Sequence, residues 1–296
     1  MKKEKKEKKY IAPNECSFKR WVAVLAVGLA LGGIVGSPLI ALTQQDNSFM
    51  GIRYAELFGQ LLFVALFFAL VFAIKFVGKT NLKDFILGVG GKVDKKQSLT
   101  IMGLYTAGLV INFLLCARCI YVRHVNAGEF AFLVVFMLLT TWMQTTWEEF
   151  IFRGFLSRWV CGNKLCFTKK SIIAAVVTAM LFAVSHAINP EVTSQSGIRI
   201  VMAIVSYAIP GLVCFFANLY FGNLLPGIIM HAANNFLVYT LIASEVTAMP
   251  LPTLLVDTAA HTGEVMLLTT SLLYVPVVVY MILDARKKKA AAAREN

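Results

Sequence analysis

The sequence predicts an all-α, polytopic membrane protein with about eight transmembrane helices. Three observations predict this class. The chain of 296 residues is 58% hydrophobic and only 15% charged, whereas an average soluble domain is about half apolar and about a quarter charged. Its apolar residues gather in long segments. Lys and Arg gather between those segments and at the two ends of the chain.

The helices are predicted from apolar segments of about 18 to 25 residues, the length that crosses a bilayer core. In chain order, these segments are approximately 21–43, 57–76, 101–121, 130–160, 172–188, 198–220, 224–243 and 265–283. The fourth segment is longer than a bilayer requires and carries polar residues in its middle. The first follows a basic start but is too long for a signal peptide, and we expect it to be retained.

The basic residues predict how these helices are oriented, because cytoplasmic loops carry an excess of Lys and Arg. We therefore expect a multi-pass protein of the cell membrane with both termini in the cytoplasm. The expected organisation is a basic cytoplasmic segment (1–20), a transmembrane domain (21–285) and a basic cytoplasmic tail (286–296). The loop from 245 to 264 contains no Lys or Arg and is expected to lie outside.

The net charge of +12 does not indicate nucleic acid as a partner, because the basic residues form topology signals and not a binding face. Membrane lipid is the expected partner. The cysteines Cys116, Cys119 and Cys214 fall in apolar segments and are expected to be small core residues. Cys161 and Cys166 lie in a predicted cytoplasmic loop with no nearby His, so we expect no zinc site there.

Ionisable side chains inside a membrane segment cost roughly 2.5 to 3.5 kcal/mol each, so they invite a functional explanation. The fourth segment carries Glu148, Glu149 and Arg153. Arg153 follows Glu149 by four residues, which places the two on one helix face as an ion pair. Glu148 is rotated by about 100° from Glu149 along the helix.

Two further segments carry polar residues in pairs. Phe182 and His186 share one helix face in the fifth segment, and His231 and Asn235 share another in the seventh. Either histidine alone would more often be an interhelical hydrogen-bonding residue. The conjunction of three polar segments favours a reactive or ligand-binding site.

A carboxylate beside a neutral histidine can remove a proton from water, and amide or imidazole N–H groups can donate to an oxyanion. This set is typical of a hydrolase that acts on a carbonyl. The sequence lacks a His-Glu-x-x-His motif, a Gly-x-Ser-x-Gly elbow and enough Asp for an aspartyl dyad. A zinc site from Glu148, His186 and His231 is chemically possible, but we expect metal-free glutamate chemistry and no cofactor.

Two other functions are compatible with the same residues. One is a non-catalytic scaffold that binds a peptide or a membrane partner at these residues. The other is a transporter that relays protons through Glu and His groups. A transporter is disfavoured because the sequence has no internal repeat of the kind common in secondary carriers.

The three motifs resemble those of the CPBP family, the CAAX prenyl endopeptidase and bacteriocin-processing group of intramembrane proteases, also called abortive-infection proteins. The family pattern is Glu-Glu-x-x-x-Arg, then Phe-x-x-x-His, then His-x-x-x-Asn or Asp. All three motifs are intact and in order. The similarity covers a protease core at about 130–243.

The resemblance implies a CAAX-protease-like bundle of eight helices with a cavity open to the cytoplasm. It implies that Glu148 and His186 activate the attacking water, and that His231 and Asn235 stabilise the oxyanion. The supporting residues would be Glu149, Arg153 and Phe182. The expected activity is a glutamate-dependent endopeptidase acting on prenylated, CAAX-type or hydrophobic membrane-associated peptides. The resemblance also implies an alternative, a bacteriocin self-immunity protein that binds a peptide or membrane partner in this cavity without cleaving it. Neither the substrate nor the oligomeric state follows from the sequence.

Overall fold

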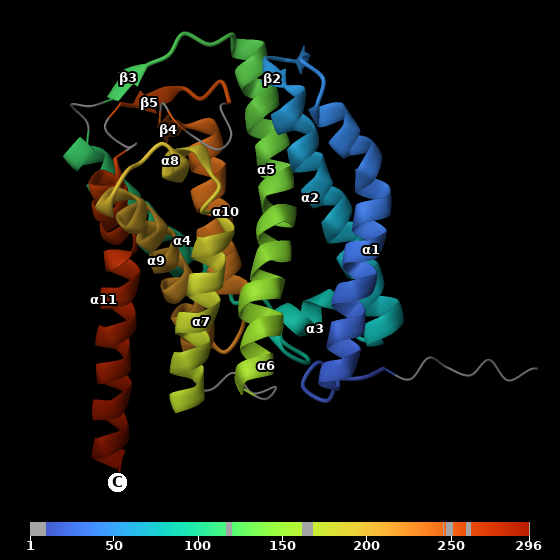
Figure 1. The fold of residues 1–296 in the computed structure, drawn as a ribbon. Helices are drawn as coiled ribbons and strands as arrows, with labels where there is room; N and C mark the ends of the chain where they lie inside the picture. Colours follow the sequence, from blue (N-terminus) through green and yellow to red (C-terminus); the bar gives the residue numbers. More distant parts are fainter. Residues whose placement is uncertain are drawn as a thin grey trace, which may run out of the picture.

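A computed structural model describes residues 10–116, 120–161, 168–244, 246, 251–258 and 262–295. Long helices run alternately up and down through the bundle (Figure 1). In order they are α1 (Phe18–Thr43), α2 (Tyr54–Ala73) with π-helix η1 (Ile74–Gly78), α4 (Lys95–Cys116), α5 (Ala127–Glu149) with π-helix η3 (Phe150–Leu156) and α6 (Ser157–Cys161), α7 (Lys169–Ser185), α9 (Ile198–Phe221), α10 (Leu225–Thr240) and α11 (Gly263–Glu295).

This architecture confirms the all-α, polytopic membrane fold. Six of the described helical segments are long and apolar enough to cross a membrane. α7 and α10, at 17 and 16 residues, are shorter than the other long helices. Each of the eight predicted apolar segments nevertheless coincides with one helix of the bundle.

Short elements close the two ends of the bundle. At the end where the described chain begins and α11 finishes, which we call the termini end, lies α3 (Leu82–Leu87). At the opposite end, which we call the sheet end, lie α8 (Pro190–Thr193) and five strands (Figure 1). The strands are β1 (Ser48–Phe49), β2 (Ile52–Arg53), β3 (Ile120–Val122), β4 (Ile242–Ser244) and β5 (Leu255–Asp257).

Strand β5 lies in the middle of a three-stranded sheet, antiparallel to β3 and parallel to β4. The predicted segments 101–121 and 224–243 therefore end too late, because α4 stops at Cys116 and α10 at Thr240. The strands that follow are three residues long, too short to give an alternating pattern that could be told from a helix end.

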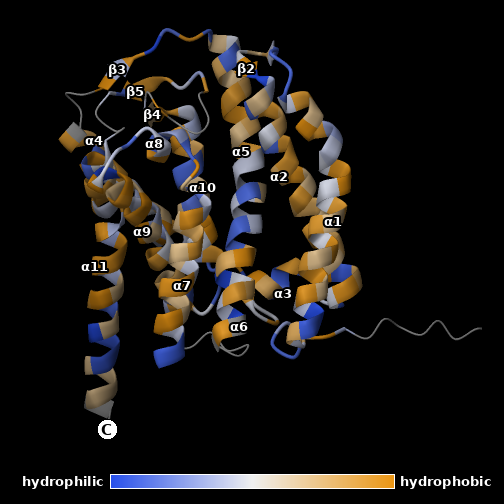
Figure 2. Ribbon diagram, in the orientation of Figure 1, coloured by the Kyte–Doolittle hydropathy of each residue, from blue (hydrophilic) through white to orange (hydrophobic). Residues whose placement is uncertain are grey.

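The packing is that of a protein surrounded by an apolar solvent. Large hydrophobic side chains are exposed along one flank of α7, including Ile173 and Val184. Polar side chains such as Gln60 and Thr178 are buried between helices. Figure 2 shows apolar colours over most of α1 and α2, and a hydrophilic stretch within α5. The polar groups in α5 thus face other helices, where they can find hydrogen-bond partners.

Candidate active site

The helix that carries Glu148 and Glu149 changes its winding directly after these residues. α5 ends at Glu149, and the π-helix η3 begins at Phe150. π-Helical turns inside α-helices are rare and frequently occur at functional sites. Within η3, Arg153 donates from Nη1 to Oε1 of Glu149 over 3.0 Å. The sequence prediction that these two residues form an ion pair agrees with this contact.

The ion pair is enclosed by α7, α9 and α10, which approach closely at two glycines. A Cβ on Gly227 of α10 would lie 2.9 Å from Oε2 of Glu149, and one on Gly211 of α9 would lie 2.9 Å from Cα of Ala179. The Gly227 N–H also donates to Oδ1 of Asn218 over 2.8 Å. Only glycine therefore fits at position 227 without displacement of the Glu149 carboxylate or the Asn218 amide.

His231 lies between the two glutamates. Its Nδ1 is 3.1 Å from Oε1 of Glu149, and its Nε2 is 3.3 Å from Oε2 of Glu148. A carboxylate oxygen only accepts, so Nδ1 carries the proton that faces ionised Glu149. The contact with Glu148 has the distance of an ion pair but not the geometry of a hydrogen bond, and Oε2 of Glu148 has no hydrogen-bond partner among the described residues.

The other oxygen of Glu148 is held by an amide relay. Gln144, one helical turn earlier, donates from Nε2 to Oε1 of Glu148 over 3.2 Å. Gln60 of α2 in turn donates to Oε1 of Gln144 over 3.2 Å. The relay fixes one carboxylate oxygen of Glu148 and leaves the other facing His231.

His186 lies at the C-terminal end of α7, where the helix gives way to a turn. Its Nδ1 is 2.8 Å from the carbonyl oxygen of Phe182. Because a carbonyl only accepts, Nδ1 carries a proton, and in the neutral ring Nε2 is then an acceptor. The ring also stacks on Tyr207 of α9, with centroids 4.4 Å apart and an interplanar angle of 22°.

Phe182 joins the two histidines and the ion pair into one cluster. Its ring centroid is 4.5 Å from that of His186 and 5.5 Å from that of His231. The Arg153 guanidinium carbon lies 4.5 Å from the same centroid, a cation–π distance. The ring thus packs against three of the predicted polar residues.

Asn235 follows His231 by one helical turn and lies in the wall of a cavity of about 230 Å³. The same cavity is lined by His186, Tyr207 and Gln144. The structure therefore brings all seven predicted site residues into one region. Six of them are linked by the contacts given above, and Asn235 shares its cavity with His186.

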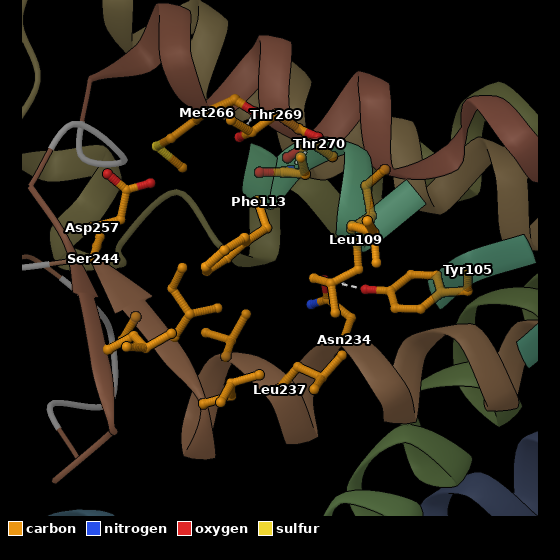
Figure 3. Close-up of a pocket in the computed structure, with 18 of the residues that line it drawn as sticks. Tyr105, Leu109, Phe113, Asn234, Leu237, Ser244, Asp257, Met266, Thr269 and Thr270 are labelled. Carbon is orange, nitrogen blue, oxygen red and sulfur yellow. Dashed lines mark hydrogen bonds between the residues drawn. The ribbon is translucent and has the colours of Figure 1, made fainter. Parts of the chain in front are cut away.

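A second cavity, of about 420 Å³, adjoins the first at the sheet end and shares seven lining residues with it. Figure 3 shows the hydrogen bond from Tyr105 to Asn234 on one side of it and Asp257 on another. The resemblance implied a cavity open to the cytoplasm. In the structure, residues of α8, β4 and β5, at the end opposite to the termini, line the larger cavity, and Glu191 of α8 also lines the smaller one.

The alternative of a zinc site requires three ligands at metal-binding distances. In the described part of the chain, no group of three or more His, Cys, Asp or Glu side chains has that arrangement. Glu148 and His231 face each other, whereas the ring of His186 packs against Phe182 and Tyr207.

The sequence prediction missed four polar residues around the cluster. Tyr207 and Asn218 lie in α9, Gln144 in α5, and Glu191 in α8. Gln144 could have been found, because it precedes Glu148 by four residues and therefore shares its helix face. Tyr207 and Asn218 carry no local signal, because they lie within a long helix that is apolar overall. Glu191 carries none either, because it lies in a short helix that follows α7 after a connection of four residues.

The comparison with protein families gave a match to type II CAAX prenyl endopeptidase Rce1-like over residues 130–237. The matched segment begins in α5, ends in α10 and contains all seven residues of the cluster. Comparisons with curated proteins and with solved structures gave no match. Residues 130–237 thus match the Rce1-like type II CAAX prenyl endopeptidases, and the resemblance predicted from the three motifs is confirmed.

Proposed function

We propose that this protein is an intramembrane endopeptidase that hydrolyses a peptide bond of prenylated or hydrophobic, membrane-associated peptides. The observation that carries the proposal is the position of Glu148. One of its carboxylate oxygens is held by Gln144, and the other is buried, unpartnered among the described residues and 3.3 Å from Nε2 of His231. A fixed, desolvated carboxylate of this kind is suited to act as a general base.

In the proposed reaction, a water molecule gives a proton to Glu148 while its oxygen bonds to the carbonyl carbon of the peptide. The neutral ring of His186 accepts the second hydrogen bond of that water through Nε2. When the tetrahedral intermediate collapses, the C–N bond breaks, and the proton on Glu148 moves to the leaving nitrogen. No metal ion is needed to balance this step.

The oxyanion that forms needs donors that are already oriented. His231 and the amide of Asn235 lie one helical turn apart on α10 and are the proposed donors. In the proposed reaction, His231 carries a proton on both ring nitrogens. Nδ1–H faces Glu149, and Nε2–H, which makes no hydrogen bond of good geometry to Glu148, turns to the substrate oxygen. Glu149 holds the other ring nitrogen, and Arg153 balances the charge of Glu149.

Cleavage by protein purified in detergent tests the proposal, with a prenylated CAAX peptide and a mixed hydrophobic peptide library as substrates. We expect Glu148→Gln and His186→Ala each to lower kcat at least about 100-fold, within the range of about 10²–10⁴ that a general base contributes. Addition of a chelator is expected to leave the rate unchanged. Glu264→Gln is the matched control, because Glu264 is a half-exposed carboxylate outside the cluster that pairs with Arg199.

Absence of cleavage by the wild-type protein, with folded variants that still bind peptide, would contradict the proposal. That result would favour the non-catalytic scaffold, for which Glu148→Gln leaves binding intact. Loss of activity on addition of the chelator would instead favour a zinc-dependent hydrolase.

A further inference from the structure

The cavity of about 420 Å³ at the sheet end combines apolar walls with carboxyl groups. The apolar part comes from α4, α10, α11 and strand β4, and includes Leu109, Phe113, Leu237 and Leu273. The carboxyl groups are those of Glu191 on α8 and Asp257 on β5, which are only 9% and 4% exposed. None of the described residues that line this cavity is Lys or Arg.

Glu191 lies in the wall that both cavities share. Its Oε1 accepts hydrogen bonds from the hydroxyl group of Tyr207 and from Nδ2 of Asn189, the latter over 3.2 Å. Its Oε2 is buried and has no hydrogen-bond partner within the described part of the chain. An unsatisfied oxygen of a buried carboxyl group is costly, so a donor supplied by a ligand would stabilise it.

Asp257 adds a second carboxyl group at the far side of the same cavity. It is the last residue of β5, and Figure 3 shows its side chain on the cavity side of the strand, across from Met266 of α11. Two acidic groups in the wall of one apolar space create a negative potential that water screens poorly.

Three described arginines of the sheet end have partners outside this cavity. Arg53 pairs with Glu56, and Arg199 pairs with Glu264. Arg123 donates to the carbonyl oxygen of Leu251 over 3.2 Å. Most other described Lys and Arg residues lie toward the termini end, in α3, at the starts of α1, α4 and α7, and in the last turns of α11.

We propose that this cavity binds an apolar stretch of the peptide substrate that carries a cationic group, a Lys or Arg side chain or a free amine. The apolar walls would take the hydrophobic side chains, and Glu191 would accept a hydrogen bond from the cation through Oε2. The inference deepens the proposed function, because the cavity adjoins the one that contains His186 and Asn235 and would set which peptides reach them.

The same charges disfavour an anionic ligand. A peptide that placed its free C-terminal carboxylate in this cavity would meet two acidic side chains of like charge. The cavity therefore favours an internal or N-terminal segment of a substrate over a segment that ends in a free carboxylate.

Peptide binding tests this inference without any need for cleavage. The protein is the full chain with Glu148→Gln, placed in nanodiscs of zwitterionic lipid so that the lipid itself attracts no cation. The probes are two fluorescent hydrophobic peptides that differ at one position, Lys in one and norleucine in the other. Norleucine keeps most of the length of the Lys side chain but removes its charge.

We expect the Lys peptide to bind at least about 10-fold more tightly, the lower end of what a charge-assisted hydrogen bond contributes. Adding Glu191→Gln should remove this difference and leave the affinity for the norleucine peptide unchanged. Adding Glu264→Gln, which removes a carboxylate of the same end outside the cavity, should preserve the difference. A third peptide that ends in a free carboxylate is expected to bind more weakly than its amidated form.

Equal affinities of the parent protein for the Lys and norleucine peptides, at every position tried, would overturn the inference. So would an equal loss of affinity for both peptides in Glu191→Gln, because that pattern indicates a structural role. If Glu191→Gln does not fold, Asp257→Asn replaces it and is expected to lower the Lys preference. A Lys preference in a protein that cleaves nothing would support this inference and contradict the proposed protease.

Discussion

Nη1 of Arg153 lies 3.0 Å from Oε1 of Glu149, and neither side chain is more than 1% exposed. Two opposite charges buried this deeply stabilise each other only as a pair, because each alone would keep its full desolvation cost. The same oxygen of Glu149 also faces Nδ1 of His231. Each charge of the pair therefore compensates the other, and Glu149 at the same time orients a proposed oxyanion donor.

The first prediction concerns the loss of one partner of this ion pair. We expect Arg153→Leu to destabilise the protein by about 3 to 5 kcal/mol, because Glu149 would remain as an uncompensated buried charge. The double variant Glu149→Leu with Arg153→Leu should recover much of this loss, since no charge is then left unpaired. Thermal unfolding in detergent measures both effects. An additive double variant would show that the two side chains do not act as a pair.

The close approach of α10 to Glu149 gives the second prediction. Gly227→Ala would place a Cβ 2.9 Å from Oε2 of Glu149 and 2.8 Å from Nδ2 of Asn218. We expect kcat/KM to fall at least about tenfold, because a displaced Glu149 carboxylate no longer holds Nδ1 of His231 in place. Peptide cleavage measures the loss.

The matched control for this variant is Gly33→Ala in α1, where an added Cβ meets no atom within 4 Å. That variant should retain full activity and gain a few tenths of a kcal/mol of stability, since alanine favours helix by up to about 1 kcal/mol over glycine. Similar losses of activity in both variants would show that the effect is not local to Glu149.

The stacking of Tyr207 on His186 gives the third prediction. The rings of Tyr207 and His186 have centroids 4.4 Å apart. Tyr207→Phe keeps this ring and removes only the hydroxyl group that donates to Glu191. Tyr207→Leu removes both. We expect cleavage of neutral peptides to be nearly unchanged in the first variant and kcat to fall at least about tenfold in the second, because His186 loses one of its two flanking rings. Equal kcat in both variants would indicate that the stack does not position His186.

Much of the fold follows from the sequence because the membrane imposes a simple rule. A helix that crosses the bilayer must hydrogen-bond its own backbone and present apolar side chains, so its length and composition reveal it. The ends are harder to predict. The last residues of the segment 224–243 are mostly apolar and give no sign of a helix end. α10 nevertheless stops at Thr240 and β4 begins at Ile242, because pairing with β5 is a long-range contact.

The candidate site was predictable to the extent that its contacts are local. The Glu149–Arg153 pair and the Phe182–His186 pair are each four residues apart, and both make the contact that helical spacing predicts. The placement of His231 between two glutamates was not predictable, because it depends on how α10 docks against α5. The π-turn that begins at Phe150 also has no signature in the sequence.

The orientation of the bundle gives the last prediction. The basic residues predict that the termini end faces the cytoplasm, which would place the sheet end and its acidic cavity outside. In a background without native cysteines, Ser196→Cys reports on the sheet end, and Lys95→Cys, at the start of α4, reports on the termini end. Both positions are exposed.

A membrane-impermeant maleimide added to intact cells should label Ser196→Cys, and it should label Lys95→Cys only after the membrane is permeabilised. The opposite pattern would place the cavity of Glu191 on the cytoplasmic side. That outcome would leave the local chemistry of Glu148 and His231 untouched. It would change the source of the peptides that reach the acidic cavity, from those delivered outside the cell to those made within it.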